Sequence, residues 1–219
     1  MALELFKFSP LPNPPAEYDP QYFRQFLRTL EIYFAQLDAL TPNQAKSYRA
    51  DNFYGDGTGI VTPKAQFTSS TSQTAASTTT AYAVSLTDTL YADRVSLVSS
   101  SRITFATAGV YNIEYALQVE NPSSTKPEDV RVWLRKNGTT NIPLSAKTFG
   151  VAAHKGSGVE SYAVASAKVM VTVAALDYVE IMWATTDIVV NLPAIAATTS
   201  PAVPTTPSAV VSVDFAVAV

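Results

Sequence analysis

Apolar residues recur at every second position in six stretches from Tyr82 onward, and this alternation limits the possible folds more than any other feature of the sequence. Such a period gives a β-strand one face in a core and one face toward solvent. The clearest run alternates with Asn112, Glu114, Ala116 and Gln118. The six apolar sets are Tyr82, Val84, Leu86; Tyr111, Ile113, Tyr115, Leu117, Val119; Val130, Val132, Leu134; Val169, Val171, Val173; Val179, Ile181, Trp183; and Val211, Val213, Phe215, Val217, Val219.

The segments between these runs carry turn signals and no helical period. Lys136-Asn137-Gly138-Thr139 predicts a hairpin turn, because Asn and Gly both tolerate positive φ. Several short strands with such connections are typical of an antiparallel β-sandwich or jelly roll. We therefore predict a mainly β head domain over residues 82–219.

One α-helix is predicted over residues 20–40. Asp19 can cap its N-terminus, and Pro20 suits its first turn. Apolar residues then follow at heptad spacing, with Leu27 and Phe34 widening the stripe on one side. The pattern favours a trimeric bundle, and the alternative is an amphipathic helix that lies on its own sandwich. The seam residues are Phe23, Phe26, Leu30, Tyr33, Leu37 and Leu40.

Residues 1–19 form a proline-rich segment that cannot be helical, since four prolines stand between positions 10 and 15. The segment also holds more large apolar residues than a solvated tail would. We expect an extended arm that docks on a partner, with packing on its own domain as the alternative. The anchoring residues are Leu3, Leu5, Phe6, Phe8 and Leu11.

Residues 41–81 are interpreted as a loop and a Ser/Thr-rich connector. The glycines at 55, 57 and 59 lack the Lys-Ser/Thr ending of a phosphate-binding loop, which favours a simple turn.

The charge balance argues against nucleic-acid binding. Only 15 % of residues are charged and the formal net charge is −3, whereas phosphate-binding surfaces need clustered Lys and Arg. The chain has no cysteine, which excludes disulfides and thiolate metal sites and suits assembly in a reducing cytoplasm. Residues 1–10 lack the apolar region of a secretory signal, and no stretch has the length of a membrane span.

Three motifs resemble the C1q/TNF-like jelly rolls. They are Ala108-Gly109-Val110-Tyr111-Asn112-Ile113, the strand and turn Val130-Arg131-Val132-Trp133-Leu134-Arg135-Lys136-Asn137-Gly138, and Ala175-Leu176-Asp177-Tyr178-Val179-Glu180-Ile181. More narrowly, VWLRKNGT, DYVEIMWATTD and the helix DPQYFRQFLRTLEIYFAQLDAL resemble structural proteins of marine tailed phages, including cyanophages. Leu176 stands where the family usually has glycine, so we expect a differently built turn there.

The resemblance implies a homotrimer on the virion surface, assembled in the host cytoplasm and held to other virion proteins by its arm. A capsid decoration protein or head fibre is the favoured function. The alternatives are a tail fibre that recognises host surface glycan through residues 150–158 or 194–207, and a secreted C1q-like or TNF-like signalling ligand.

No motif predicts an enzyme, a cofactor or a metal site. His154 is the only histidine and lies in an expected loop tip, without a nucleophile-elbow motif elsewhere. Glu114, Glu120, Asp177 and Glu180 are most simply strand positions that face solvent. Asp51 and Asp56 could contribute to a calcium site but lack an ordered acidic loop. Trp133 and Trp183 could face a sugar, although core or interface packing is favoured.

Overall fold

The structure of the protein is a computed structural model, which describes residues 17, 19–40, 62–154, 156 and 159–218. The chain divides into two compact units, Met1–Phe53 and Tyr54–Val219, and each unit is described by itself.

The first unit contains helix α1 (Pro20–Leu40). The backbone N–H of Gln21 donates a hydrogen bond to Asp19 Oδ1 at 2.8 Å, and Phe23 N–H donates to the Asp19 carbonyl at 3.2 Å. Asp19 therefore satisfies backbone donors that a helix leaves unpaired in its first turn. The predicted helix, its bounds and its N-cap are confirmed.

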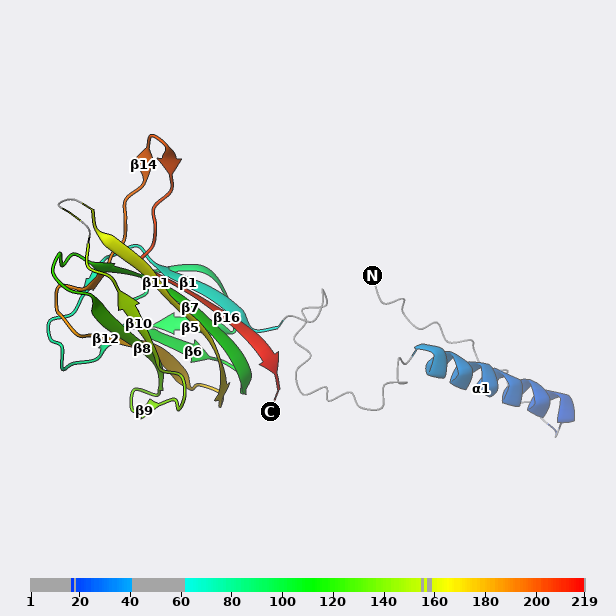
Figure 1. Cartoon of the computed structure of the whole chain (residues 1–219). Coiled ribbons are helices and arrows are strands. Elements are labelled where there is room, and N and C mark those ends of the chain that lie inside the picture. The colour runs from blue at the N-terminus through cyan, green and yellow to red at the C-terminus, as the bar shows by residue number, and fades with distance from the viewer. Residues whose placement is uncertain (1–16, 18, 41–61, 155, 157–158, 219) are drawn as a thin grey trace. The chain divides into compact units, whose positions relative to one another are not determined.

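The second unit is an antiparallel β-sandwich whose two main sheets we name sheet A and sheet B (Figure 1). Sheet A contains β1 (Lys64–Ser69), β2 (Gln73–Thr74), β4 (Asp88–Asp93), β7 (Gly109–Asn121), β11 (Ser161–Val173), β13 (Asn191–Leu192) and β16 (Ala209–Val217). Sheet B contains β3 (Tyr82–Ala83), β5 (Val95–Val98), β6 (Arg102–Phe105), β8 (Glu128–Lys136), β9 (Thr140–Asn141), β10 (Lys147–Val151) and β12 (Tyr178–Thr185). A small hairpin is formed by β14 (Thr198–Thr199) and β15 (Ala202–Val203).

The long strands pair in a nested order. In sheet A, β1 pairs with β16 and β7 pairs with β11; in sheet B, β6 pairs with β12 and β8 pairs with β10. Early strands thus pair with late ones, and strands from the middle of the sequence pair with each other. Because β16 also pairs with β7, and β1 with β4, sheet A has the spatial order β11-β7-β16-β1-β4. Strands β11 and β4 are therefore edge strands.

One hydrophobic core lies between the sheets. The inward positions of β7 are fully buried, as are those of β8 and the middle of β16. Trp183 on β12 is 1 % exposed, and its ring centroid lies 6.0 Å from that of Tyr82. The predicted alternation in these strands is confirmed, and the core residues include Ile113, Leu117, Val132, Leu134, Val211 and Val213.

The sandwich begins at Lys64 rather than at Tyr82, so the boundary expected from the sequence is wrong. β1 lies between β16 and β4 and buries Ala65, Phe67 and Ser69. The following Ser/Thr-rich run is also tied to the head: Gln73 Nε2 donates to the Ser85 carbonyl at 3.0 Å, and Ser85 N–H donates to Gln73 Oε1 at 2.7 Å. Small side chains suit these positions but give little hydrophobic signal.

The predicted hairpin turn between β8 and β9 is confirmed. Asn137 and Gly138 have φ values of 50° and 71°, the left-handed conformation that such turns require. A Cβ atom at Gly138 would also lie 2.7 Å from the hydroxyl of Tyr178.

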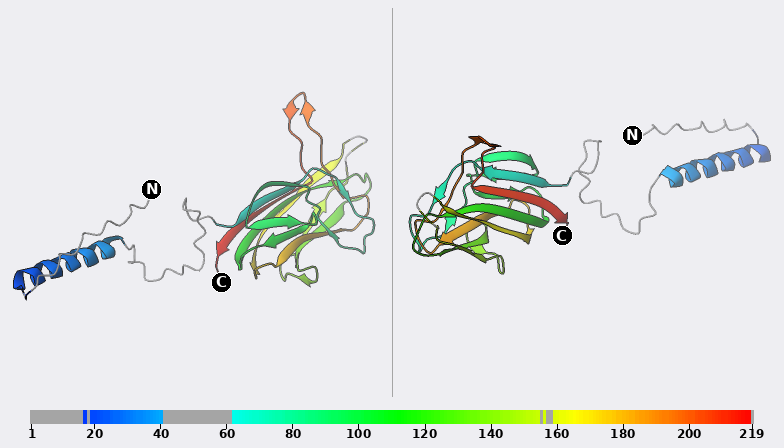
Figure 2. Two further views of the ribbon diagram at one scale, coloured as in Figure 1. Left: turned by 180° about the vertical axis from the view of Figure 1, so that it is seen from behind. Right: turned by 45° about the horizontal axis from the view of Figure 1, so that its top comes forward.

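The β14–β15 hairpin projects from the sandwich (Figures 1 and 2). Its base is closed by reciprocal backbone hydrogen bonds between Ile195 and Thr206, each 2.9 Å long. Within the described residues, no helix is both long and apolar enough to cross a membrane.

Candidate functional site

The described part of α1 carries a broad apolar surface. Phe23 is 49 % exposed, and Leu27 and Phe34 are 53 % and 63 % exposed. The rings of Tyr22, Phe23 and Phe26 form a cluster with centroid separations of 6.3 to 6.5 Å. Of these residues, Phe23 and Phe26 belong to the predicted seam, and Leu27 and Phe34 widen it on one side. The helix therefore offers an apolar surface that a partner could cover.

Several predicted site residues lie outside the description. The side chains of Tyr33, Leu37 and Leu40 are not described, and neither are the anchoring residues Leu3, Leu5, Phe6, Phe8 and Leu11. Asp51 and Asp56 also lie outside the described residues. The trimeric seam and the anchoring arm therefore stay predictions.

The outer face of sheet A has an apolar end on edge strand β11. Tyr162, Val164 and Met170 point outward there and are 45 %, 59 % and 64 % exposed. The register places Ala116 of β7 between Ser166 of β11 and Val210 of β16. This end of the face therefore combines exposed apolar side chains with smaller ones, and the exposed Lys168 of β11 stands among them opposite Glu114 of β7.

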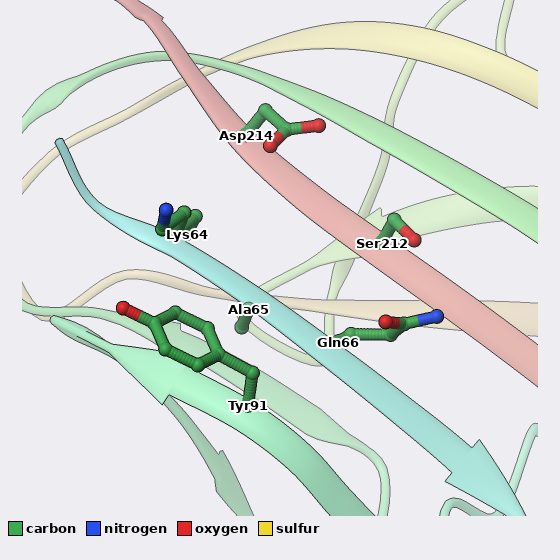
Figure 3. A pocket seen from close by; sticks show the side chains of 6 residues that line it. All are labelled: Lys64, Ala65, Gln66, Tyr91, Ser212 and Asp214. Carbon is green, nitrogen blue, oxygen red and sulfur yellow. The ribbon is translucent and has the colours of Figure 1, made fainter.

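The opposite end of the same face has a shallow hollow of about 280 Å³, open to solvent (Figure 3). Lys64 and Gln66 of β1 line it, together with Tyr91 of β4 and Ser212 and Asp214 of β16; buried Ala65 contributes to its lining. The Lys64 ammonium lies 5.3 Å from the centroid of the Tyr91 ring. The hollow thus has an aromatic surface and four polar side chains.

The outer face of sheet B carries a network of polar contacts around a buried glutamate. Glu180 on β12 is only 5 % exposed, and its Oε2 accepts hydrogen bonds from Arg135 Nε at 3.2 Å and Nη2 at 2.9 Å. Its Oε1 accepts from Ser101 Oγ at 3.3 Å and lies 3.9 Å from Arg102 Nε. The Arg102 guanidinium lies over the ring of Tyr178, 4.9 Å from its centroid. These contacts join β12, β8 and the β5–β6 turn.

The turn before β12 is held by a second polar cluster. Asn137 Nδ2 donates to Asp177 Oδ1 at 2.7 Å, and Ala174 N–H donates to Asp177 Oδ2 at 2.8 Å. These two hydrogen bonds, the first of them the stronger influence, hold the pKa of Asp177 below its usual value. Leu176 adopts φ 69°, the left-handed conformation that glycine favours. Leucine therefore adopts a conformation that glycine favours, and the expectation that this turn differs from that of the C1q/TNF-like family stays a prediction.

The four carboxylates considered for catalysis are not brought together. Glu114 and Glu120 lie on the outer face of sheet A, whereas Glu180 lies on the outer face of sheet B and Asp177 lies in the turn before β12. Glu180 does not face solvent, which corrects the expectation for this residue. The fold can bury this carboxylate because Arg135 and Ser101 donate hydrogen bonds to it.

His154 lies in the segment after β10, as predicted. Its backbone N–H donates to the Ser123 carbonyl at 2.9 Å, and its Nδ1 accepts from Gly156 N–H at 3.2 Å. Across the described part of the chain, no group of three or more His, Cys, Asp or Glu could hold a metal ion.

The two tryptophans have different surroundings. Trp183 is a core residue, as favoured from the sequence. Trp133 lies on the outer face of sheet B, where its Nε1–H donates to Asn141 Oδ1 at 2.9 Å. Of the two loops expected to recognise glycan, residues 194–207 form the projecting hairpin, and residues 150–158 are described only in part.

Comparison with known proteins gives no assignment: no protein-family model matches the chain, and no curated protein matches it. The hollow on sheet A was missed from the sequence. Its residues come from three strands that are far apart along the chain, so no local spacing indicates the site.

Proposed function

We propose that this chain is a non-enzymatic structural protein of a tailed-phage particle, a homotrimer that its N-terminal arm attaches to other virion proteins. Its place is the capsid surface, as a decoration protein or head fibre. The observation that carries the proposal is that the chain combines a β-sandwich head with a helix in a second compact unit, on which Phe23, Leu27 and Phe34 are about half exposed. Three copies of such a helix can bury these residues against one another.

The strand order supports a jelly-roll head. Eight strands pair first with last and inner with inner, as in a long hairpin folded into two sheets. This arrangement agrees with the C1q/TNF-like motifs in the sequence. It favours a trimer because that family assembles its jelly rolls around a threefold axis.

The apolar end of sheet A supplies a second surface for self-association. Tyr162, Val164 and Met170 would bury apolar area between neighbouring heads, adding to the contact between the helices. Trimerisation would also hold three arms together, so that three weak attachments act as one strong attachment.

The first test is the native mass of the full chain, measured by light scattering over a dilution series. We expect the mass of three chains for the unmodified protein and a loss of trimer on dilution for Phe23→Ser. Ile32→Ser is the matched control, because Ile32 is 50 % exposed but lies nine residues along α1 from Phe23, on the opposite side of the helix. A stable monomer, or equal loss in both variants, would contradict the proposal.

The same preparations test attachment. A chain without residues 1–19 is expected to remain a folded trimer that no longer binds particles lacking this protein. Continued binding by the shortened chain would contradict the anchoring role of the arm.

A second candidate function is favoured by the projecting β14–β15 hairpin. A tail fibre or other receptor-binding protein needs a part that extends beyond the body of the head, and this hairpin does so (Figures 1 and 2). Immunogold labelling of intact particles separates the two: label over the head supports decoration, and label on the tail supports receptor binding.

A further inference from the structure

We propose that the hollow on the outer face of sheet A is a binding site for a neutral saccharide. The proposal goes beyond the structural function above, because it depends on neither the trimer nor the arm. It also assigns saccharide recognition to a β-sheet surface, rather than to the two loops expected from the sequence.

The hollow is built by the register of three neighbouring strands. Lys64 and Gln66 of β1 stand opposite Asp214 and Ser212 of β16, and Gln66 stands opposite Tyr91 of β4. Since side chains of one strand alternate between faces, all five point to the outer face of the sheet. Figure 3 shows the Tyr91 ring and the four polar side chains around one open space.

The polar side chains of the hollow have hydrogen-bonding groups that the protein itself does not use. Within the part of the chain that the structure describes, the side chains of Gln66, Ser212 and Asp214 make no hydrogen bond. Lys64 and Asp214 are direct cross-strand neighbours but form no ion pair there. By contrast, Gln73, Asp177 and Glu180 all bind neighbouring groups of the protein.

These groups match the chemistry of a sugar. A pyranose presents hydroxyl groups that both donate and accept, and the hollow offers a carboxylate acceptor, an ammonium donor, and an amide and a hydroxyl that can do either. The C–H bonds on one side of the ring can contact the electron-rich face of Tyr91. Tyr91 is 47 % exposed, and the Lys64 ammonium over it can move aside because an exposed cation–π contact is weak.

The charge balance of the hollow disfavours other ligands. One lysine and one aspartate give no net charge, whereas phosphate sites need several cationic or N–H donors. A single carboxylate is too little for a calcium site, which takes six to eight oxygen ligands. A neutral polyhydroxylated ligand fits this combination best.

The experiment uses the full-length protein and saturation-transfer NMR with glucose, galactose, mannose and N-acetylglucosamine. A parallel arm uses affinity electrophoresis in gels containing neutral bacterial polysaccharide, so that free sugar and surface glycan are distinguished as sources. We expect saturation transfer to at least one sugar, or retardation by the polysaccharide. Tyr91→Ala should weaken that binding by about tenfold or more, because it removes the stacking surface.

Val98→Ala is the matched control. Val98 is 45 % exposed, close to the value for Tyr91, but lies on β5 of sheet B and outside the hollow. We expect its binding to equal that of the unmodified protein, and Asp214→Ala to weaken binding. No binding to any probe, or equal loss in Tyr91→Ala and Val98→Ala, would overturn the site. Native mass remains the test of the trimer, so failure of one proposal leaves the other standing.

Discussion

The outer faces of the two sheets differ in how their polar side chains are satisfied. On sheet B, Glu180 is buried against Arg135 and Ser101, and Trp133 binds Asn141. On sheet A, Gln66, Ser212 and Asp214 have no such partners among the described residues, and Val164 and Met170 are exposed. Sheet B thus has an ion pair with a buried glutamate on its outer face, whereas the hollow on sheet A has polar side chains that are open to a ligand. Variants of residues on the two faces test what this difference means.

The variant with the largest expected effect, Glu180→Ala, tests whether the polar contacts on the outer face of sheet B contribute to stability. Glu180→Ala removes a buried carboxylate and leaves Arg135 without its partner, so the free energy of unfolding should fall by about 3 kcal/mol. Glu114→Ala is the matched change on the outer face of sheet A and should alter it by no more than about 0.5 kcal/mol. Urea unfolding at one fixed protein concentration measures both. Equal losses would remove the distinction between the faces.

Two buried tyrosines on β7 of sheet A differ in the same respect, namely whether the side-chain hydroxyl has a hydrogen-bond partner. Tyr111 Oη lies 2.8 Å from Thr107 Oγ1, whereas Tyr115 Oη has no hydrogen-bond partner among the described residues. Burial raises the pKa of Tyr115 to about 12. Above pH 10 the unfolded chain loses this proton while the folded chain keeps it. Stability should therefore fall by up to about 2 to 3 kcal/mol as pH rises from 10 to 12.

Tyr115→Phe should abolish the loss of stability that the Tyr115 hydroxyl causes between pH 10 and 12. It should also raise the free energy of unfolding at neutral pH by about 1 kcal/mol, because no unpaired hydroxyl remains buried. Tyr111→Phe should lower stability at neutral pH by a similar amount, since it loses the contact with Thr107. Urea unfolding at several pH values compares each variant with the unmodified protein. A destabilised Tyr115→Phe would mean that this hydroxyl does have a partner.

The smallest expected effect concerns Leu176, a strained position in the turn before β12. Leu176 is 78 % exposed and holds φ 69°, so its side chain contributes little burial to offset its backbone strain. Leu176→Gly should raise the free energy of unfolding by about 0.5 to 1 kcal/mol. Leu176→Ala keeps a Cβ atom and should change it less. A loss of stability in the glycine variant would show that the leucine side chain has a structural role.

The sequence predicted the elements whose signal is strong and local. The helix followed from heptad spacing and the Asp19 cap, and β7, β8, β12 and β16 followed from large apolar residues at alternate positions. β1 was missed because Phe67 is its only large inward residue, beside Ala65 and Ser69. The burial of Glu180 was missed because its partners, Arg135 and Ser101, come from other strands and turns. The hollow was missed for the same reason.

The nested strand order also sets when the head can form during synthesis. β16 lies between β1 and β7, so neither of these strands has its full set of neighbours until the last strand is made. β1 is translated long before its partner, and its open edges meanwhile resemble those that recruit other chains into aggregates. Chaperone capture of the nascent chain should therefore concentrate on β1 and β7, and should end when β16 leaves the ribosome.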